Sequence, residues 1–477
     1  MRKWKRLTAA LLGLCMAAPT MTGVFAADPH PLDIDGDAEF TVMDIICVTK
    51  YILGCQTKAP NLAAADMDKD GQVDTYDLGL LKRALFKGEA VTNKAVNLSA
   101  SYTASAVKAV PMDEQTVLGQ TKFALDLLKY TSAAEKGKNV LVSPYSVSQA
   151  LGMTANGAKG DTRKEMETVL GGSMETLNPA FYTVRTSAPD TEDAKLSTAN
   201  SIWVRNGYPV RADFLQTNAD YYGADAFAAP FDTTTLNEIN GWVDEKTDHM
   251  VPTILDEIPR NTMMYLVNAV AFDAKWIKPY MENEVMKGTF TAADGTKQEA
   301  TMLCRTLGTY LTDKHATGFM QYYTGQQYAF AAILPEEGMT PEAYLADLTP
   351  ERLHTMLAKP EEVAVSTTMP EFSYDFGTLL NDSLKSMGMP SAFGSKADFS
   401  GMTDDPVGLY ISRVIHKTHI EVTPVGTRAG AATVVEMTKN SAPFSEKKVT
   451  LDRPFVYAIV DTQTSLPVFI GTVNSIR

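Results

Sequence analysis

The tract Gly426-Thr-Arg-Ala-Gly-Ala-Ala-Thr-Val-Val-Glu-Met-Thr-Lys-Asn-Ser-Ala-Pro-Phe444 begins with small residues and stands shortly before Asp452-Arg-Pro-Phe455. If it became a β-strand, alternate side chains would face opposite ways. Within residues 427–438, the two charged side chains, Arg428 and Glu436, would then share one face. A plain small-residue loop predicts no such segregation, although two charges share a face by chance half the time. The other face would hold only uncharged residues, Thr427, Ala429, Ala431, Thr433, Val435 and Met437.

The long part of the chain around this tract, from Thr116 to Val473, shows both helical and strand patterns. Thr116 to Tyr130 has helical apolar spacing, Val363 to Phe376 alternates like a strand, and Phe455 to Val473 has the pattern of two strands. These patterns follow no regular βαβ order. They predict an α+β architecture for the large C-terminal part of the chain.

Seven motifs in a fixed order accompany the tract. They are NVLVSPYSVSQALGMTANGAKGDTRKEMETVL at 139–170, LVNAVAFDAKWIKPY at 266–280, MPEFSYDF at 369–376, ADFSGM at 397–402, VIHKTHIEV at 414–422, DRPF at 452–455 and FIGTVN at 469–474. Together with the tract they resemble the serpin family across nearly all of residues 114–477. The resemblance implies three β-sheets with surrounding helices and an exposed reactive loop.

The resemblance also assigns roles to individual residues. The hinge that inserts first would be Gly426, Thr427, Ala429, Gly430, Ala431, Ala432 and Thr433. The polar cluster that controls sheet opening would be Ser143, Ser146, Asn268 and His416, with Trp276 at the point of first insertion. The family's spacing puts the bond cut by a protease at Asn440-Ser441, with Lys439 and Met437 as alternatives.

Four residues depart from the pattern that the resemblance implies. Pro424 and Arg428 stand where the family usually or often has Glu, and Asp273-Ala274 replace the usual Lys-Gly. Pro424 removes an acid and a donor near the hinge. It precedes the inserting residues, so we expect any effect to fall on the metastability of the fold or on the mobility of the loop.

A second feature is a twelve-residue acidic pattern that occurs twice, 33 positions apart. Hard oxygens at loop positions one, three, five, seven and twelve suit Ca²⁺. The ligands would be Asp33, Asp35, Asp37, Glu39 and Asp44 in the first loop, and Asp66, Asp68, Asp70, Gln72 and Asp77 in the second. Glu39 and Gln72 would supply backbone carbonyls, and we expect two calcium ions.

Each loop leads into an apolar helical stripe, and an Asp occupies position twelve of both loops. This tandem at residues 31–89 resembles the type I dockerin module, a small all-α unit that docks onto cohesin modules of scaffolding proteins in cellulosome-type assemblies. The resemblance implies that the partner is read by Val42, Met43, Thr49 and Lys50, and by Thr75, Tyr76, Lys82 and Arg83. Ala38 replaces the glycine usual at position six, so we expect the first calcium site to be the weaker.

The remaining segments define the chain's organisation. Residues 1–26 have the basic start, apolar run and small-residue end of a secretory signal, which predicts export. No later segment predicts a membrane span. Residues 90–113 show no periodic apolar face and predict a flexible linker. Cys47, Cys55 and Cys304 remain after the signal, an odd number that offers no disulfide scaffold.

Composition and missing motifs exclude several classes of function. The 477 residues carry 43 basic and 57 acidic side chains, and a net charge of −14 argues against nucleic acid or anionic membrane as a partner. The common hydrolase and phosphate-binding motifs are missing, so we expect no enzymatic activity.

The sequence therefore predicts a secreted, monomeric suicide inhibitor of serine proteases, and possible cysteine protease targets stay open. Its dockerin would anchor it to a cohesin-bearing extracellular complex. The alternative is a non-inhibitory serpin-fold binding module displayed on the same complex.

Overall fold

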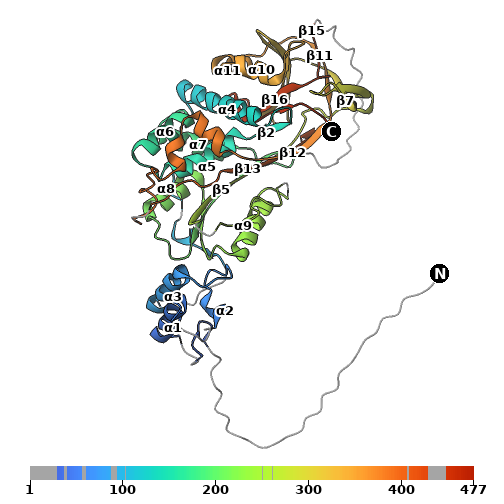
Figure 1. The fold of residues 1–477 in the computed structure, drawn as a ribbon. Helices are drawn as coiled ribbons and strands as arrows, with labels where there is room; N and C mark the ends of the chain where they lie inside the picture. Colours follow the sequence, from blue (N-terminus) through green and yellow to red (C-terminus); the bar gives the residue numbers. More distant parts are fainter. Residues whose placement is uncertain are drawn as a thin grey trace, which may run out of the picture. The chain divides into compact units, whose positions relative to one another are not determined.

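A computed structural model describes residues 30–36, 40–55, 61–87, 94–102, 104–249, 251–259, 262–405, 408–427 and 447–477. The chain divides into two compact units, Met1–Ala90 and Val91–Arg477, and each is described by itself (Figure 1). Within the described ranges, no helix combines the length and apolar character that crossing a membrane requires.

The small unit consists of the helices α1 (Val42–Ile52), α2 (Leu62–Ala65) and α3 (Thr75–Lys87). Thr41 and Asp44 form a capping box that starts α1 directly after the first acidic loop. Val48 of α1 and Leu81 of α3 are fully buried, and both belong to the repeated apolar stripes. The repeat thus folds as a pair of packed loop–helix units.

A seven-stranded sheet organises the large unit (Figure 1). Its order is β1 (Val96–Asn97), β4 (Asp225–Ala229), β3 (Ala194–Arg205), β5 (Met264–Lys275), β14 (Gly426–Thr427), β13 (Ile415–Val422) and β12 (Phe372–Leu379). Strands β3 and β5 pair along eleven residues, from Ala194↔Ala274 to Val204↔Met264. The central strand β14, by contrast, is only two residues long.

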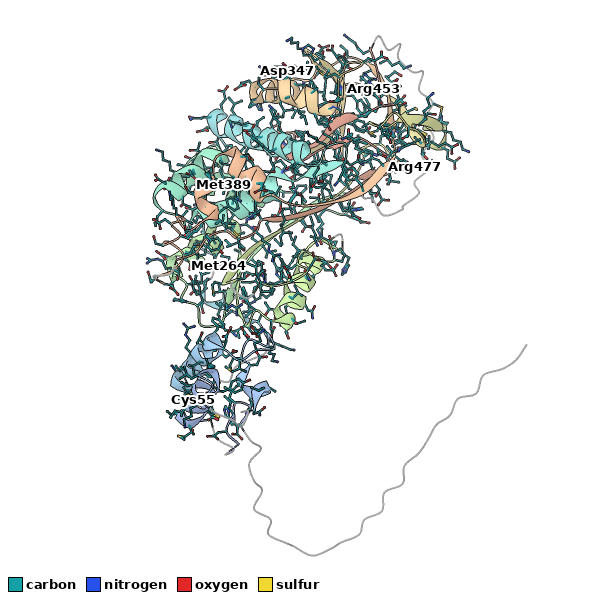
Figure 2. The ribbon with its side chains drawn as sticks, in the orientation of Figure 1. Cys55, Met264, Asp347, Met389, Arg453 and Arg477 are labelled. Carbon is teal, nitrogen blue, oxygen red and sulfur yellow. The ribbon has the colours of Figure 1, made fainter. Side chains whose placement is uncertain are left out.

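Two further sheets complete the core. The six-stranded sheet has the order β2 (Val140–Val142), β17 (Leu466–Val473), β16 (Phe455–Asp461), β10 (Tyr328–Pro335), β9 (Ala316–Tyr322) and β8 (Tyr310–Asp313). The four-stranded sheet has the order β15 (Lys447–Thr450), β11 (Val365–Pro370), β7 (Lys297–Leu307) and β6 (Val285–Thr291). Side chains fill the space between sheets and helices (Figure 2).

Helices surround these sheets. They are α4 (Glu114–Ala134), α5 (Pro144–Ala155), α6 (Gly160–Leu170), α7 (Met174–Ser187), α8 (Ala212–Tyr222), α9 (Thr233–Lys246), α10 (Pro341–Asp347), α11 (Pro350–Ala358) and α12 (Asn381–Met387), with short 3-10 turns at Ser99–Ser101, Glu282–Glu284 and Pro390–Phe393. Helices α5 and α9 lie on opposite faces of the seven-stranded sheet (Figure 1).

Two sequence expectations require correction. The described part of residues 90–113 does not behave as a free linker, because β1 pairs with β4 and the Val110 N–H donates to Thr183 Oγ1 at 2.7 Å. The alternating stretch from Val363 to Phe376 is two strands rather than one. After Pro370 the chain leaves β11 for β12, which belongs to another sheet.

Candidate functional site

The hinge begins inside the seven-stranded sheet. After β13 the chain turns at residues 423–425, and β14 then pairs with strands on both sides, with Thr427 opposite Val422 of β13 and Ala274 of β5. A side chain at Gly426 would collide with the backbone of Ala274, so the close approach requires glycine. The first two residues of the predicted hinge are therefore already strand residues.

An aromatic contact holds this end of the sheet. The hydroxyl of Thr427, a buried residue, is hydrogen-bonded to Tyr323 Oη at 2.5 Å. The Tyr323 ring stacks on Trp276 with centroids 4.5 Å apart, and the Trp276 indole donates to the Thr423 carbonyl at 2.9 Å. Trp276 thus supports the turn that aims the chain into the sheet.

Backbone hydrogen bonds hold the turn at Pro424, the position at which the family usually has Glu. The Pro424 carbonyl accepts the Tyr280 N–H at 2.8 Å, and the Val425 carbonyl accepts the Trp276 N–H at 2.9 Å. Arg305 lies over the Tyr280 ring at 3.7 Å and donates to Glu284 Oε2 at 2.6 Å. The turn is therefore fixed without an acidic side chain at position 424.

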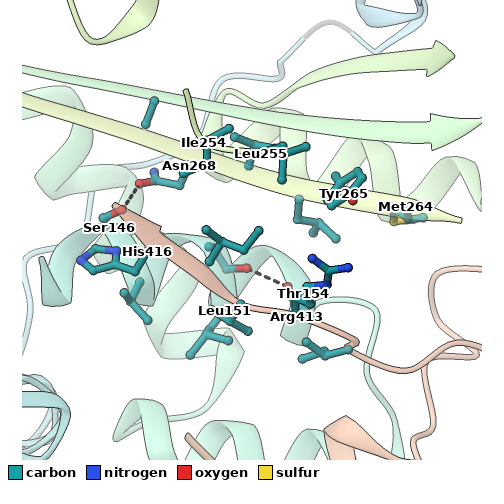
Figure 3. A pocket seen from close by; sticks show the side chains of 18 of the residues that line it. Ser146, Leu151, Thr154, Ile254, Leu255, Met264, Tyr265, Asn268, Arg413 and His416 are labelled. Atoms are coloured by element: carbon teal, nitrogen blue, oxygen red, sulfur yellow. Dashed lines mark hydrogen bonds between the residues drawn. The ribbon is translucent and has the colours of Figure 1, made fainter. Parts of the chain in front are cut away.

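Beyond Thr427 a cavity of about 420 Å³ follows the space between β5 and β13. Figure 3 shows β5 and β13 on either side of this space. Most of its lining is apolar, contributed by α5, by α9 and the chain after it, and by the two strands, for example Val147, Leu151, Val243, Ile254, Leu255 and Val270. We call it the strand slot, because it lies in line with β14.

A polar cluster crosses the slot, as the sequence predicts. The Ser143 N–H donates to His416 Nε2 at 3.0 Å, and the Ser146 hydroxyl donates to Asn268 Oδ1 (Figure 3). Ser143 is the N-cap of α5, with its Oγ accepting the Ser146 N–H at 3.1 Å. The cap places both serines between β13 and β5, so the cluster links the two sides of the slot.

Burial controls the charge of this cluster. His416 is completely enclosed, and this desolvation lowers its pKa to about 4. Its Nε2 accepts a hydrogen bond, so the neutral ring carries its proton on Nδ1. The network continues from Asn268 Nδ2 to Asn200 Oδ1 at 2.8 Å, which extends it into β3.

The structure separates one residue from this cluster. Trp276 lies at the β14 end of the slot, whereas Ser143, Ser146, Asn268 and His416 meet farther along it. The remaining hinge residues and the predicted cleavage positions lie outside the described residues, as do residues 1–26 and Ala38. These positions are Ala429, Gly430, Ala431, Ala432, Thr433, Met437, Lys439, Asn440 and Ser441.

The acidic loops of the small unit bring carboxylates together. Oxygens of Asp33, Asp35 and Asp44 lie within 4.8 Å of one another, and so do oxygens of Asp66, Asp68 and Asp70. Each group supplies three hard oxygens of the kind that Ca²⁺ prefers, and further oxygens would complete the six to eight that the ion takes. The predicted ligand Asp77 is not part of the second group. Asp37 and Glu39 lie outside the described residues.

The last loop position has a structural role in both copies. Asp44 accepts the N–H groups of Ile34 at 2.7 Å and Thr41 at 2.7 Å. Asp77 accepts those of Met67 at 2.7 Å and Asp74 at 2.8 Å. Each carboxylate thereby fastens the beginning of its loop to the helix that follows.

The predicted partner-reading residues lie on both long helices. On α1, Val42 and Met43 are more than half exposed, Lys50 is exposed, and Thr49 is half-buried. On α3, Thr75, Lys82 and Arg83 are exposed and Tyr76 is half-buried. Ile46 and Leu53 are exposed as well. Ile46 lies one helical turn after Val42 on α1.

Comparison with known proteins finds a matching family for each of the two units. The family described as serpin (serine protease inhibitor) matches residues 118–476, and the dockerin type I domain matches residues 31–86. A serpin-like protein of Thermococcus kodakarensis is 30% identical, with 79% of this chain and 91% of the relative covered. Serpin-ZXA of Oryza sativa subsp. japonica is 30% identical over 75% of this chain and 96% of its own.

Solved structures give the same result. The native state of the thermophilic serpin tengpin is 40% identical with a TM-score of 0.75, covering 80% of this chain and all of that one. The latent state of tengpin is 39% identical with a TM-score of 0.69, covering 78% of this chain and all of that one. With its three sheets, central slot and dockerin-matching small unit, the chain belongs to the serpin family and carries an N-terminal dockerin type I domain.

Proposed function

We propose that this protein is a secreted suicide inhibitor of serine proteases, held by its dockerin on a cohesin-bearing extracellular complex such as a cellulosome. The observation that carries the proposal is β14, whose two residues pair with β5 and β13 at the end of an apolar strand slot. A cut reactive loop can lengthen this strand without any rearrangement of its first residues.

The existing pairs of β14 support one register for the proposed insertion. If β14 extends without a bulge, Ala431 lies between Val270 and Thr418, and Thr433 lies between Asn268 and His416. Thr427 points into the core, so the residues two, four and six positions later point inward as well. Those positions are the uncharged face of the tract.

The same register also determines the neighbours of Arg428, whose side chain would point away from the core. Arg428 would lie opposite Asp273 of β5 and Glu421 of β13, both on the exposed face of the sheet. Two of the departures from the family pattern, Arg428 and Asp273, thus complement each other in charge. Cross-strand pairs of opposite charge stabilise a sheet.

In the proposed reaction the protease supplies the chemistry. Its serine hydroxyl attacks the carbonyl carbon of Asn440, or of Lys439 or Met437 in the alternative registers. The peptide C–N bond breaks, the new amine takes the serine proton, and an ester joins inhibitor to protease. Loop insertion must then outrun hydrolysis of this ester, which favours small residues at the hinge.

The dockerin determines where this happens. Calcium held by the two acidic loops would order the helices that present the docking residues. A docked inhibitor has a high local concentration around the complex, so it intercepts proteases that approach the assembly.

The proposal is tested by mixing the secreted protein with serine and cysteine proteases and separating the products on SDS gels. We expect an SDS-resistant covalent complex and release of the fragment after the cut bond, identified by mass spectrometry. Loop cleavage without any complex would instead support the non-inhibitory binding module.

A further inference from the structure

A group of buried polar side chains lies away from the slot, between α5, β3 and the ends of β10 and β16. Tyr145 and Gln149 are one turn apart on the same face of α5. Tyr328 starts β10 and pairs directly with Asp461 of β16. The exposed fractions of these four residues are 8%, 0%, 2% and 4%, respectively.

Other polar groups surround these residues. The hydroxyl of Thr198 on β3 lies next to that of Tyr145, and Arg185 of α7 and Asp461 are near enough to affect its ionisation. Asp461 and Tyr145 are likewise neighbours of Tyr328. One cluster therefore joins five secondary-structure elements in the interior of the large unit.

Several polar atoms of the cluster have no hydrogen-bond partner among the described residues. These atoms are Gln149 Nε2 and Oε1, Arg185 Nε and Tyr328 Oη. Buried polar atoms in folded proteins are nearly always paired with protein or ordered water, because leaving them unpaired is costly. Four such atoms in one cluster indicate a shared partner.

The chemistry of the cluster restricts that partner. Hydroxyls and an amide can donate and accept, so the partner must do both. The positive Arg185 and the acidic Asp461 oppose each other in charge, which disfavours a bound ion. Buried water makes about three hydrogen bonds per molecule, so about two waters are the minimum for four atoms.

We propose that this cluster is a hydration site, in which ordered water molecules connect α5 to β3 and to the six-stranded sheet. The hydration site does not depend on the proposed inhibitory function. Its waters support the uncleaved fold, because they supply hydrogen bonds that no described residue provides.

The experiment compares three tyrosine-to-phenylalanine variants of the full chain. Tyr145→Phe and Tyr328→Phe each remove one hydroxyl from the hydration site. Tyr374→Phe is the matched control, since this buried hydroxyl is hydrogen-bonded directly to Tyr457 Oη at 2.7 Å. Oxygen-17 relaxation dispersion counts long-lived buried waters, and a thermal melt gives the unfolding midpoint.

We expect Tyr145→Phe and Tyr328→Phe to lose long-lived water and to lower the midpoint. Tyr374→Phe should lower the midpoint with an unchanged water count. A cluster without water predicts an unchanged water count and a raised midpoint for Tyr145→Phe and Tyr328→Phe, since deleting an unpaired buried hydroxyl stabilises the fold. An unchanged water count in either variant that folds, or a small molecule released from the denatured protein, overturns the proposal.

Discussion

The buried hydroxyls of Tyr323 and Thr427 share a hydrogen bond of 2.5 Å. Tyr323 follows β9 of the six-stranded sheet, whereas Thr427 ends β14 of the seven-stranded sheet. The bond therefore ties β14, the start of the predicted hinge, to the core beneath it, and it determines that the Thr427 side chain faces inward.

Replacing Tyr323 with Phe should destabilise the uncleaved protein by about 1–3 kcal/mol, because the buried Thr427 hydroxyl loses its partner. Thr427→Val should have a similar cost. Chemical denaturation of both single variants and the double variant gives the coupling between them. We expect the double variant to lose less than the sum, and additive losses would contradict the contact.

Thr433→Arg should convert the inhibitor into a substrate. The register places position 433 between Asn268 and His416, where a buried charge without a partner is strongly unfavourable. Insertion would stall while the ester hydrolyses, so the cleaved form should accumulate in place of the covalent complex. Thr433→Ala, small and uncharged, should remain inhibitory. Equal complex formation by both variants would refute this register.

A charge exchange tests the outer face of the same strand. Arg428→Glu would place three acidic side chains side by side, and Asp273→Lys should restore a favourable pair. Exposed ion pairs contribute about 0.2–1 kcal/mol, so we expect Arg428→Glu to slow complex formation by up to about 5-fold. The double variant should recover most of the rate in a stopped-flow assay with the target protease. No recovery would argue for another register.

Stability should fall as the pH decreases from about 6.5 to 4. Burial holds the pKa of His416 at about 4, below its usual value of 6.5, so the unfolded chain binds the proton first. Stability that is present above pH 6.5 is therefore lost on acidification, by as much as about 3 kcal/mol. Urea denaturation across this range should show the decline, and His416→Gln should show less of it.

Calcium titration should find two sites in the full chain. Asp33→Ala and Asp66→Ala each remove one carboxylate from a loop, so each variant should retain one site by calorimetry. The affinity remaining in Asp33→Ala should exceed that in Asp66→Ala, because we expect Ala38 to make the first site the weaker one. Two full sites in either variant would show that the carboxylate is not a ligand.

Hydrophobic periodicity in the sequence predicted the long helix and strands whose pattern is regular. The helical spacing from Thr116 to Tyr130 lies within α4, and the two strands of Phe455 to Val473 are β16 and β17. Alternation could not locate the change from β11 to β12, because both strands alternate and only their partners differ. The two-residue β1 is too short to have any period at all.

The positions of the sites could not be predicted from hydrophobic periodicity alone. Ser143 and His416 are far apart in the sequence, and only the family resemblance placed them together before the structure did. No pattern marked the hydration site, since Tyr145, Thr198 and Tyr328 come from three separate elements whose packing decides their neighbours. Tertiary packing, rather than local propensity, creates both sites.

Because β14 is paired on both edges, the proposed inhibitor would keep a permanent structural change after it meets a protease. Each molecule that has met a protease would retain a full-length central strand, bonded on both edges, and could not return to its starting form. The fraction of molecules with this long strand in the surrounding fluid would then measure past proteolytic attacks on the assembly, after the proteases themselves had gone.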